Sequence, residues 1–152
     1  MKNKREIVYW ILLIAWMGVI FIMSNQPASI SDSESVGVIK LLSSLGLDMN
    51  GIFGQFANFI VRKCAHFLEY MILALLAFNV FTLYYNMKQV IIFTIILVFI
   101  YACTDEVHQL FVPGREGAIR DVIIDTTGGT ILIIIRILRL NLAKLYAMKR
   151  EN

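Results

Sequence analysis

The chain has 152 residues, of which 59% are hydrophobic and 16% are charged. This composition is too apolar for an ordinary soluble domain of that length and predicts a membrane protein. The formal net charge is only +3, and most of the excess lies at the two chain ends. Because no basic stripe is present to follow a phosphate backbone, we expect no nucleic-acid partner.

Four apolar stretches follow one another along the chain. They predict an all-α fold, a four-helix transmembrane bundle that forms one domain over residues 1–152. The spans are expected at about residues 7–23, 62–85, 90–109 and 119–138. A signal peptide is the alternative for the first stretch, but no small-residue cleavage site follows it.

The distribution of Lys and Arg predicts the orientation of these spans. Nine of the fourteen basic residues lie at the chain ends or between the second and third spans. Cytoplasmic loops carry the positive excess, so both termini are predicted to be cytoplasmic. Two extracytoplasmic segments then remain, at about residues 24–61 and 105–121.

The first extracytoplasmic segment has the pattern of an amphipathic helix that lies on the membrane surface. Ser31-x-x-Glu34 matches a capping box, in which the two side chains would close the start of the helix. Apolar residues follow at helical spacing, namely Val36, Ile39, Leu42 and Leu45.

The two cysteines, Cys64 and Cys103, are too far apart in the sequence to form a CxxC pair. Both are expected near the outer ends of adjacent spans, where a disulfide is geometrically feasible. We favour two free cysteines that pack as small apolar core residues. Serine-hydrolase and nucleotide-loop motifs do not occur in the sequence.

Ionisable residues interrupt the second span at helical spacing. Arg62, His66 and Glu69 are four and three residues apart, so they share one face of a helix about 60° wide. That face lies on the outer half of the span and must meet a neighbouring element.

The third span carries a second polar face at its outer end. Asp105, His108 and Gln109 repeat the same spacing, and Glu106 lies about a quarter-turn away. Because the second and third spans are antiparallel, the two polar faces are expected to meet.

The fourth span begins with Asp121 and Asp125, which are four residues apart. A central Asp costs about 2.5–3.5 kcal/mol on insertion scales, so carboxylates on three helices must face one another or water. We therefore predict one shared polar pocket at the extracytoplasmic end.

Gly128 and Gly129 would let a neighbouring helix approach the fourth span closely. Arg115, in a turn with Pro and Gly, suits a phosphate or carboxylate.

These polar motifs occur in a fixed order along the chain. They are Ser24-Asn25-Gln26, the run Arg62–Tyr70, the run Asp105–Arg115, and Asp121-x-x-x-Asp125-x-x-Gly128. The ordered series, over about residues 16–135, resembles the VanZ-like family of small bacterial membrane proteins. That family takes its name from low-level resistance to the glycopeptide teicoplanin. The resemblance implies a cell-envelope role in the bacterial cell membrane and leaves the mechanism open.

The first hypothesis for function is an enzyme that acts at the outer membrane interface on a lipid, a lipid-linked cell-wall precursor or a lipidated compound. A histidine would act as general acid or base, with a carboxylate to orient it. The candidate catalytic residues are His66, Glu69, Asp105, Glu106, His108, Asp121 and Asp125. The candidate substrate-binding residues are Ser24, Gln26, Arg62, Lys63, Gln109 and Arg115. No nucleophile is evident, so water, a substrate hydroxyl or a histidine would attack.

The sequence requires no cofactor, but a divalent metal is an alternative. His66-x-x-Glu69 and Asp105-x-x-His108 are mirrored pairs on antiparallel helices, an arrangement that helical bundles use to build metal sites. The ligand set would be His66, Glu69, Asp105, His108 and Asp125. The first span supplies no carboxylate, unlike the usual di-metal pattern.

The second hypothesis is a non-catalytic binder that shields a cell-wall precursor or sequesters an amphipathic antibiotic. It needs the same charged residues, so conservative changes discriminate the two. His66→Gln or Asp125→Asn would abolish catalysis while leaving much of a binding function. A carrier is a weaker hypothesis, because the ionisable residues lie near one membrane face, and a structural scaffold is the remaining alternative.

Overall fold

The computed structural model describes residues 2–151, and the side chains of residues 4–143 and 145–150. Met1 and Asn152, which the predicted domain includes, lie outside the described residues. The elements are α1 (Lys2–Ser24), α2 (Ala28–Ser44), α3 (Met49–Phe53), the 3-10 helix η1 (Gly54–Phe56), α4 (Ala57–Phe81), α5 (Met87–Gln109) and α6 (Ile119–Glu151). Every regular element in this range is helical, which confirms the predicted all-α class.

Three helical stretches within the described residues are long and apolar enough to cross a membrane. They are Lys4–Ser24, Met49–Phe81 and Met87–Gln109. The stretch 119–138, predicted as a fourth span, lies inside α6 and is not one of these three. Asp121, Asp125 and Arg136 interrupt its apolar run, whereas α5 is free of charges from Gln89 to Thr104.

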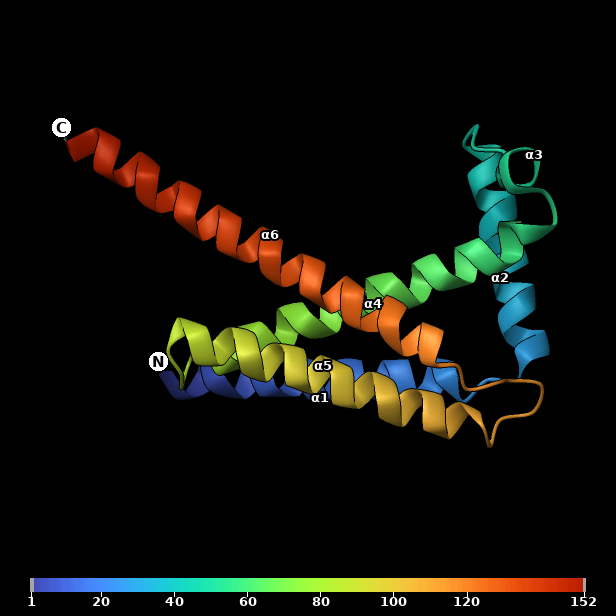
Figure 1. Ribbon diagram of the computed structural model, residues 1–152, viewed down its shortest axis with the longest axis horizontal. Helices are drawn as coiled ribbons and strands as arrows, with labels where there is room; N and C mark the ends of the chain where they lie inside the picture. Colours follow the sequence, from blue (N-terminus) through green and yellow to red (C-terminus); the bar gives the residue numbers. More distant parts are fainter. Residues whose placement is uncertain (1, 152) are drawn as a thin grey trace.

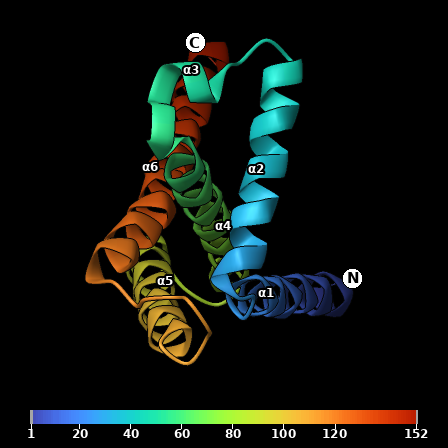
Figure 2. The same ribbon diagram turned by 90° about the vertical axis from the view of Figure 1, so that its right-hand side faces the viewer.

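The long helices form a bundle, and α2 and the loop before α6 cover one end of it. Figure 1 shows α1 and α5 side by side, with α4 and α6 crossing above them, and both chain termini at the same end. At the other end α2 runs across the bundle, and the loop between α5 and α6 lies beside it (Figures 1 and 2). We refer to this as the α2 end; it contains most of the polar residues singled out in the sequence.

Helix α4 is the central element, because α1, α2, α5 and α6 all pack against it. Its core face carries Tyr70, Leu73, Ala74 and Ala77, each fully buried. The two alanines leave room for neighbouring backbones, and Leu13 and Ile20 of α1 pack into the same cluster.

The glycine pair of α6 permits close contacts with α4 and α5. A Cβ on Gly128 would overlap the backbone carbonyl oxygen of Phe67 in α4, and a Cβ on Gly129 would lie 2.8 Å from a methyl group of Val98 in α5. Small residues at such positions let helices pack backbone to backbone. The prediction that a neighbouring helix closely approaches the stretch 119–138 at its glycine pair is therefore confirmed.

The predicted capping box at the start of α2 is wrong. The helix begins one turn earlier, because the carbonyl of Pro27 accepts hydrogen bonds from Ile30 and Ser31 N–H at 3.0 and 3.2 Å. Ser31 consequently lies inside the first turns, and no side chain caps the helix. The fixed φ of Pro27 suits this position at the helix start.

The two cysteines are free, as we favoured, but neither lies in the core. Cys64 is exposed on α4 and Cys103 is half-buried on α5. The expectation of core packing is wrong for Cys64 because the core face of α4 carries Tyr70, Leu73, Ala74 and Ala77, and residue 64 lies more than about 100° around the helix from that face.

Candidate functional site

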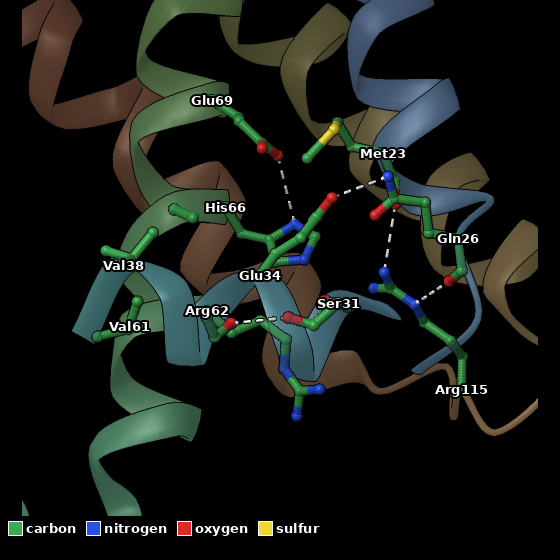
Figure 3. Close-up of a pocket in the computed structure, with 12 residues that line it drawn as sticks. Met23, Gln26, Ser31, Glu34, Val38, Val61, Arg62, His66, Glu69 and Arg115 are labelled. Atoms are coloured by element: carbon green, nitrogen blue, oxygen red, sulfur yellow. Dashed lines mark hydrogen bonds and ion pairs between the residues drawn. The ribbon is translucent and has the colours of Figure 1, made fainter. Parts of the chain in front are cut away.

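A cavity of about 260 Å³ opens at the α2 end between α2 and α4 (Figure 3). We call it the α2–α4 cavity. Its lining includes Met23 and Gln26 at the end of α1, Glu34 and Val38 of α2, Val61, Arg62, His66 and Glu69 of α4, and Arg115. Most of the lining surface is apolar, and the ionisable groups are Arg62, His66 and Glu69 of α4, Glu34 of α2, and Arg115 of the loop before α6.

The spacing of Arg62, His66 and Glu69 places all three on the cavity side of α4. Figure 3 shows His66 and Glu69 projecting into the space that Met23 closes from the other side. The His66 Nδ1 atom lies 3.7 Å from Glu69 Oε2, and the side chains are 14% and 18% exposed. This separation allows electrostatic interaction but exceeds a hydrogen bond, and Nδ1 has no hydrogen-bond partner among the described residues.

Arg115 reaches the cavity from the loop between α5 and α6. Gly114, with φ of +74°, provides the turn that directs it inward. The Arg115 guanidinium donates from Nε to the carbonyl of Gln26 at 3.0 Å and from Nη2 to that of Met23 at 3.2 Å. Burial, and then the nearby charge of Arg62, lower the pKa of Arg115, yet a guanidinium stays protonated at neutral pH. The loop is thus fastened to the end of α1 by a cation.

A second cavity, of about 180 Å³, lies beside the first. We call it the basic cavity, because four cations line it: Arg62, Lys63, Arg115 and Arg120. Glu116 and Asp121 are the carboxylates in its lining, and Gln109 contributes an amide. Arg62, His66 and Arg115 line both cavities, so the two spaces meet at these three side chains.

Asp105 belongs to a buried network between α1 and α5. Its Oδ2 accepts hydrogen bonds from Ser24 Oγ at 2.9 Å and from Gln109 Nε2 at 3.2 Å. Gln109 Nε2 also donates to Ser24 Oγ at 2.9 Å, which closes the triangle. Ser24 and Asp105 therefore line neither cavity, contrary to the predicted placement.

His108 does not share a pocket with His66. Its Nε2 lies 3.1 Å from Asn25 Oδ1, and its ring lies 4.6 Å from that of Phe21, both at the end of α1. Asp105 does not orient His108, because its Oδ2 accepts hydrogen bonds from Ser24 and Gln109 instead. A rotation of α5 about its own axis by a few tens of degrees changes which neighbouring helix each of its side chains contacts.

The remaining carboxylates lie where α6 packs on α4 and α5. Asp121 Oδ2 lies 2.5 Å from Lys63 Nζ, and Glu106 Oε2 accepts a 2.8 Å bond from the Ala118 N–H just before α6. Asp125 is 1% exposed, and neither of its oxygens has a hydrogen-bond partner among the described residues. Such an unpartnered buried carboxylate is costly and needs an explanation.

The predicted single pocket is thus replaced by two cavities and a buried network. Of the predicted catalytic residues, His66 and Glu69 line the α2–α4 cavity and Asp121 lines the basic cavity. The others line neither cavity: Asp105, Glu106, His108 and Asp125. The predicted binding residues Gln26, Arg62, Lys63, Gln109 and Arg115 each line one cavity or both.

The five candidate metal ligands are divided among these places. Within the described part of the chain, no three His, Cys, Asp or Glu side chains gather as a group able to hold a metal ion. Metal binding stays a prediction of the sequence.

Three charged residues near the cavities were not among the candidate site residues predicted from the sequence. Asp32 accepts a 2.8 Å bond from Arg62 Nη1, Glu34 lines the α2–α4 cavity, and Arg120 lines the basic cavity. The acidic pair in the first outer segment could have been matched with Arg62 by charge. The sequence alone does not show that α2 folds back across α4.

Together the fold and the cavities define a class: an all-helical membrane protein with a charged, cavity-containing site at one end. The family model described as VanZ/LLP1 matches residues 9–140, so the chain belongs to the VanZ-like family. The resemblance seen in the ordered motifs is thereby confirmed. No curated protein and no solved structure matches the chain.

Proposed function

We propose that the chain crosses the cell membrane four times, with both termini in the cytoplasm and the α2 end facing outward. The positive-inside rule supports this orientation, since nine of fourteen basic residues then lie inside. The beginning of α1 and the end of α6 both lie on the side of the molecule opposite α2 (Figure 1). Helix α6, with 33 residues, is about 50 Å long and reaches across a bilayer even when tilted.

The α2 end acts on a membrane amphiphile: a lipid, a lipid-linked cell-wall precursor or a lipidated compound. The observation that carries this proposal is the α2–α4 cavity itself. It combines apolar walls from Met23, Val38 and Val61 with a few ionisable groups from α4, α2 and the loop before α6. A mostly apolar cavity with a few convergent polar groups is the usual form of a small-molecule site.

The proposed chemistry is acid/base catalysis by His66. Glu69 lies near enough to bias the orientation of the imidazole, and Arg62 and Arg115 hold an anionic head group. Ser31 and Ser35 line the cavity, but the Ser35 hydroxyl donates to the Ser31 carbonyl, and neither serine is hydrogen-bonded to His66. The attacking group is therefore water or a substrate hydroxyl.

One observation favours the second candidate function, a binder that shields a precursor or sequesters an amphipathic antibiotic. His66 Nδ1 is 3.7 Å from Glu69 and has no hydrogen-bond partner among the described residues. A histidine that is not fixed by a hydrogen bond is less well prepared for proton transfer. A binder requires only that the cavity and its charges persist.

The VanZ-like family supports a role in the cell envelope and in teicoplanin resistance for this chain. The test expresses the full chain and its His66→Gln and Glu69→Gln variants in a susceptible bacterial host, with Lys40→Gln as an exposed control on α2. Teicoplanin susceptibility, the amount of protein in the membrane and the extracted lipids are measured together.

The enzyme proposal predicts that His66→Gln and Glu69→Gln abolish protection and any lipid change at normal protein levels. The binder proposal predicts that most of the protection survives in both variants. If the wild-type chain gives no protection and leaves the lipids unaltered, both proposals are wrong. The same holds if protection only follows the amount of protein.

A further inference from the structure

The two cavities at the α2 end differ in chemistry although they share three side chains. The α2–α4 cavity is mostly apolar, with Met23, Val38 and Val61 in its walls. The basic cavity is polar and lies toward Lys63, Arg120 and the start of α6. A ligand that occupies both must therefore be apolar at one end and charged at the other.

The charged residues that line the basic cavity indicate that the polar end of the ligand is an anion. Its lining holds four cations against two carboxylates. Lys63 is paired with Asp121, and Arg62 is paired with Asp32 on α2. Arg115 is different, because its guanidinium is held by two backbone carbonyls and forms no ion pair with a carboxylate of the described residues. The charge of Arg115 is left to attract an anion.

Arg120 is the second cation that can reach a ligand, because its one ion pair is long and uses Asp121, a carboxylate that Lys63 already neutralises. Its side chain is 65% exposed, it lies over the ring of Phe59 at 5.0 Å, and its Nε is 3.6 Å from Asp121. The cavity volume of about 180 Å³ corresponds to roughly six water molecules at about 30 Å³ each. That is room for a phosphate group with part of its hydration shell, and guanidinium groups bind phosphate with matched geometry.

The apolar cavity suits a hydrocarbon chain next to that phosphate. Val61 is nearly buried in its wall, whereas Val38 is 44% exposed at its edge, so the cavity opens beside an apolar surface of α2. Each methylene group transferred out of water contributes about 0.8 kcal/mol. A chain that enters here brings its polar end to Arg62, His66 and Arg115.

We propose that the ligand is a phosphate-bearing amphiphile, with its phosphate in the basic cavity and the first part of its hydrocarbon chain in the α2–α4 cavity. Its phosphoester then lies at His66, which borders both cavities. This inference rests on the proposed function and names the substrate class for it.

The test measures binding to the full chain in a neutral detergent by native mass spectrometry. Three probes separate the sources of affinity: dodecyl phosphate, dodecanol and inorganic phosphate. We expect dodecyl phosphate to bind at least about tenfold more tightly than either of the others, since each lacks one half of the interaction.

Two variants, each with a matched control, test where the phosphate and the hydrocarbon chain of the ligand bind. Arg120→Gln removes one cation and should weaken dodecyl phosphate about tenfold, while Lys40→Gln, which removes an exposed cation lining neither cavity, should not. Val38→Gln should weaken dodecyl phosphate several-fold without affecting inorganic phosphate. Val36→Gln is its control, because Val36 is 41% exposed on the same helix and lines neither cavity.

Several results overturn the inference. Equal binding of dodecanol and dodecyl phosphate shows that no phosphate site is used. Equal binding of inorganic and dodecyl phosphate shows a site for a free anion only. Unchanged affinity in Arg120→Gln and Val38→Gln places the ligand elsewhere. If dodecyl phosphate does not bind as expected but His66→Gln loses protection, the substrate class is wrong and the proposed function stands. If dodecyl phosphate binds as expected but His66→Gln keeps full protection, only the enzyme proposal is overturned.

Discussion

Lys63 of α4 and Asp121 of α6 form an ion pair across the helix interface at the α2 end, with Nζ 2.5 Å from Oδ2. Both side chains are largely buried, at 15% and 11% exposure. The pair fixes the first turn of α6 against α4, beside the basic cavity that both residues line. Removing Asp121 leaves the buried Lys63 charge without a carboxylate partner, whereas removing Lys63 leaves Asp121 with only the exposed Arg120, whose Nε lies 3.6 Å away.

The first prediction follows from this pair. Asp121→Leu alone should lower the free energy of unfolding by about 3 kcal/mol, since it leaves a buried Lys63 charge without a partner, and Lys63→Met should cost somewhat less because Arg120 still faces Asp121. The double variant should recover most of that loss. A double-mutant cycle on thermal unfolding in detergent measures the coupling, and strictly additive losses would show that the pair does not interact.

The second prediction concerns the contact between α6 and α4 at Gly128. Gly128→Ala should lower the free energy of unfolding by about 2 kcal/mol, because its methyl group would overlap the Phe67 carbonyl and push the helices apart. Gly37→Ala is the control: it lies within α2, a Cβ there meets nothing within 4 Å, and alanine favours helix. Equal effects of the two substitutions would contradict the close approach.

The third prediction contrasts two buried carboxylates. Asp125 has no hydrogen-bond partner among the described residues, so Asp125→Asn should leave stability unchanged or raise it by about 1 kcal/mol. Asp105 accepts bonds from Ser24 and Gln109, so Asp105→Asn should cost about 1–2 kcal/mol. Thermal unfolding of both variants checks this order. The reverse order would mean that Asp125 has a partner in the membrane.

The fourth prediction concerns the loop before α6. Arg115→Lys keeps the charge but loses the planar fork that reaches the carbonyls of Gln26 and Met23. Amide hydrogen exchange of residues 110–118 should become at least about fivefold faster, corresponding to roughly 1 kcal/mol. Unchanged exchange would show that other contacts, such as the Ala28 N–H bond to the Pro113 carbonyl, hold the loop alone.

Much of the fold could be predicted because long apolar runs and helical spacing are local properties of the sequence. The spacing of Arg62, His66 and Glu69 correctly places them on one face, and the Gly128–Gly129 pair correctly marks a close helix contact. Neither inference requires knowledge of which helices are neighbours.

The site as a whole could not be predicted, because it depends on how helices turn against one another. The sequence does not show that His108 faces Asn25 or that Asp105 is satisfied by Ser24. It also does not show that α2 starts at Ala28 and packs against α4. This packing forms the α2–α4 cavity and brings Asp32 to Arg62. Pro27 sets that start through backbone geometry, while the Ser31 and Glu34 pattern pointed one turn further on.

The central claim is that His66 acts as the acid/base group of a functional site in the α2–α4 cavity, and the two histidines test it most directly. His66 lines that cavity and His108 does not, although both are polar residues near the α2 end. Teicoplanin susceptibility is measured in a host that expresses the wild type, His66→Gln or His108→Gln at equal membrane levels. We predict that His66→Gln loses protection and that His108→Gln retains it. Retained protection in His66→Gln, or equal loss in both variants, would contradict the account.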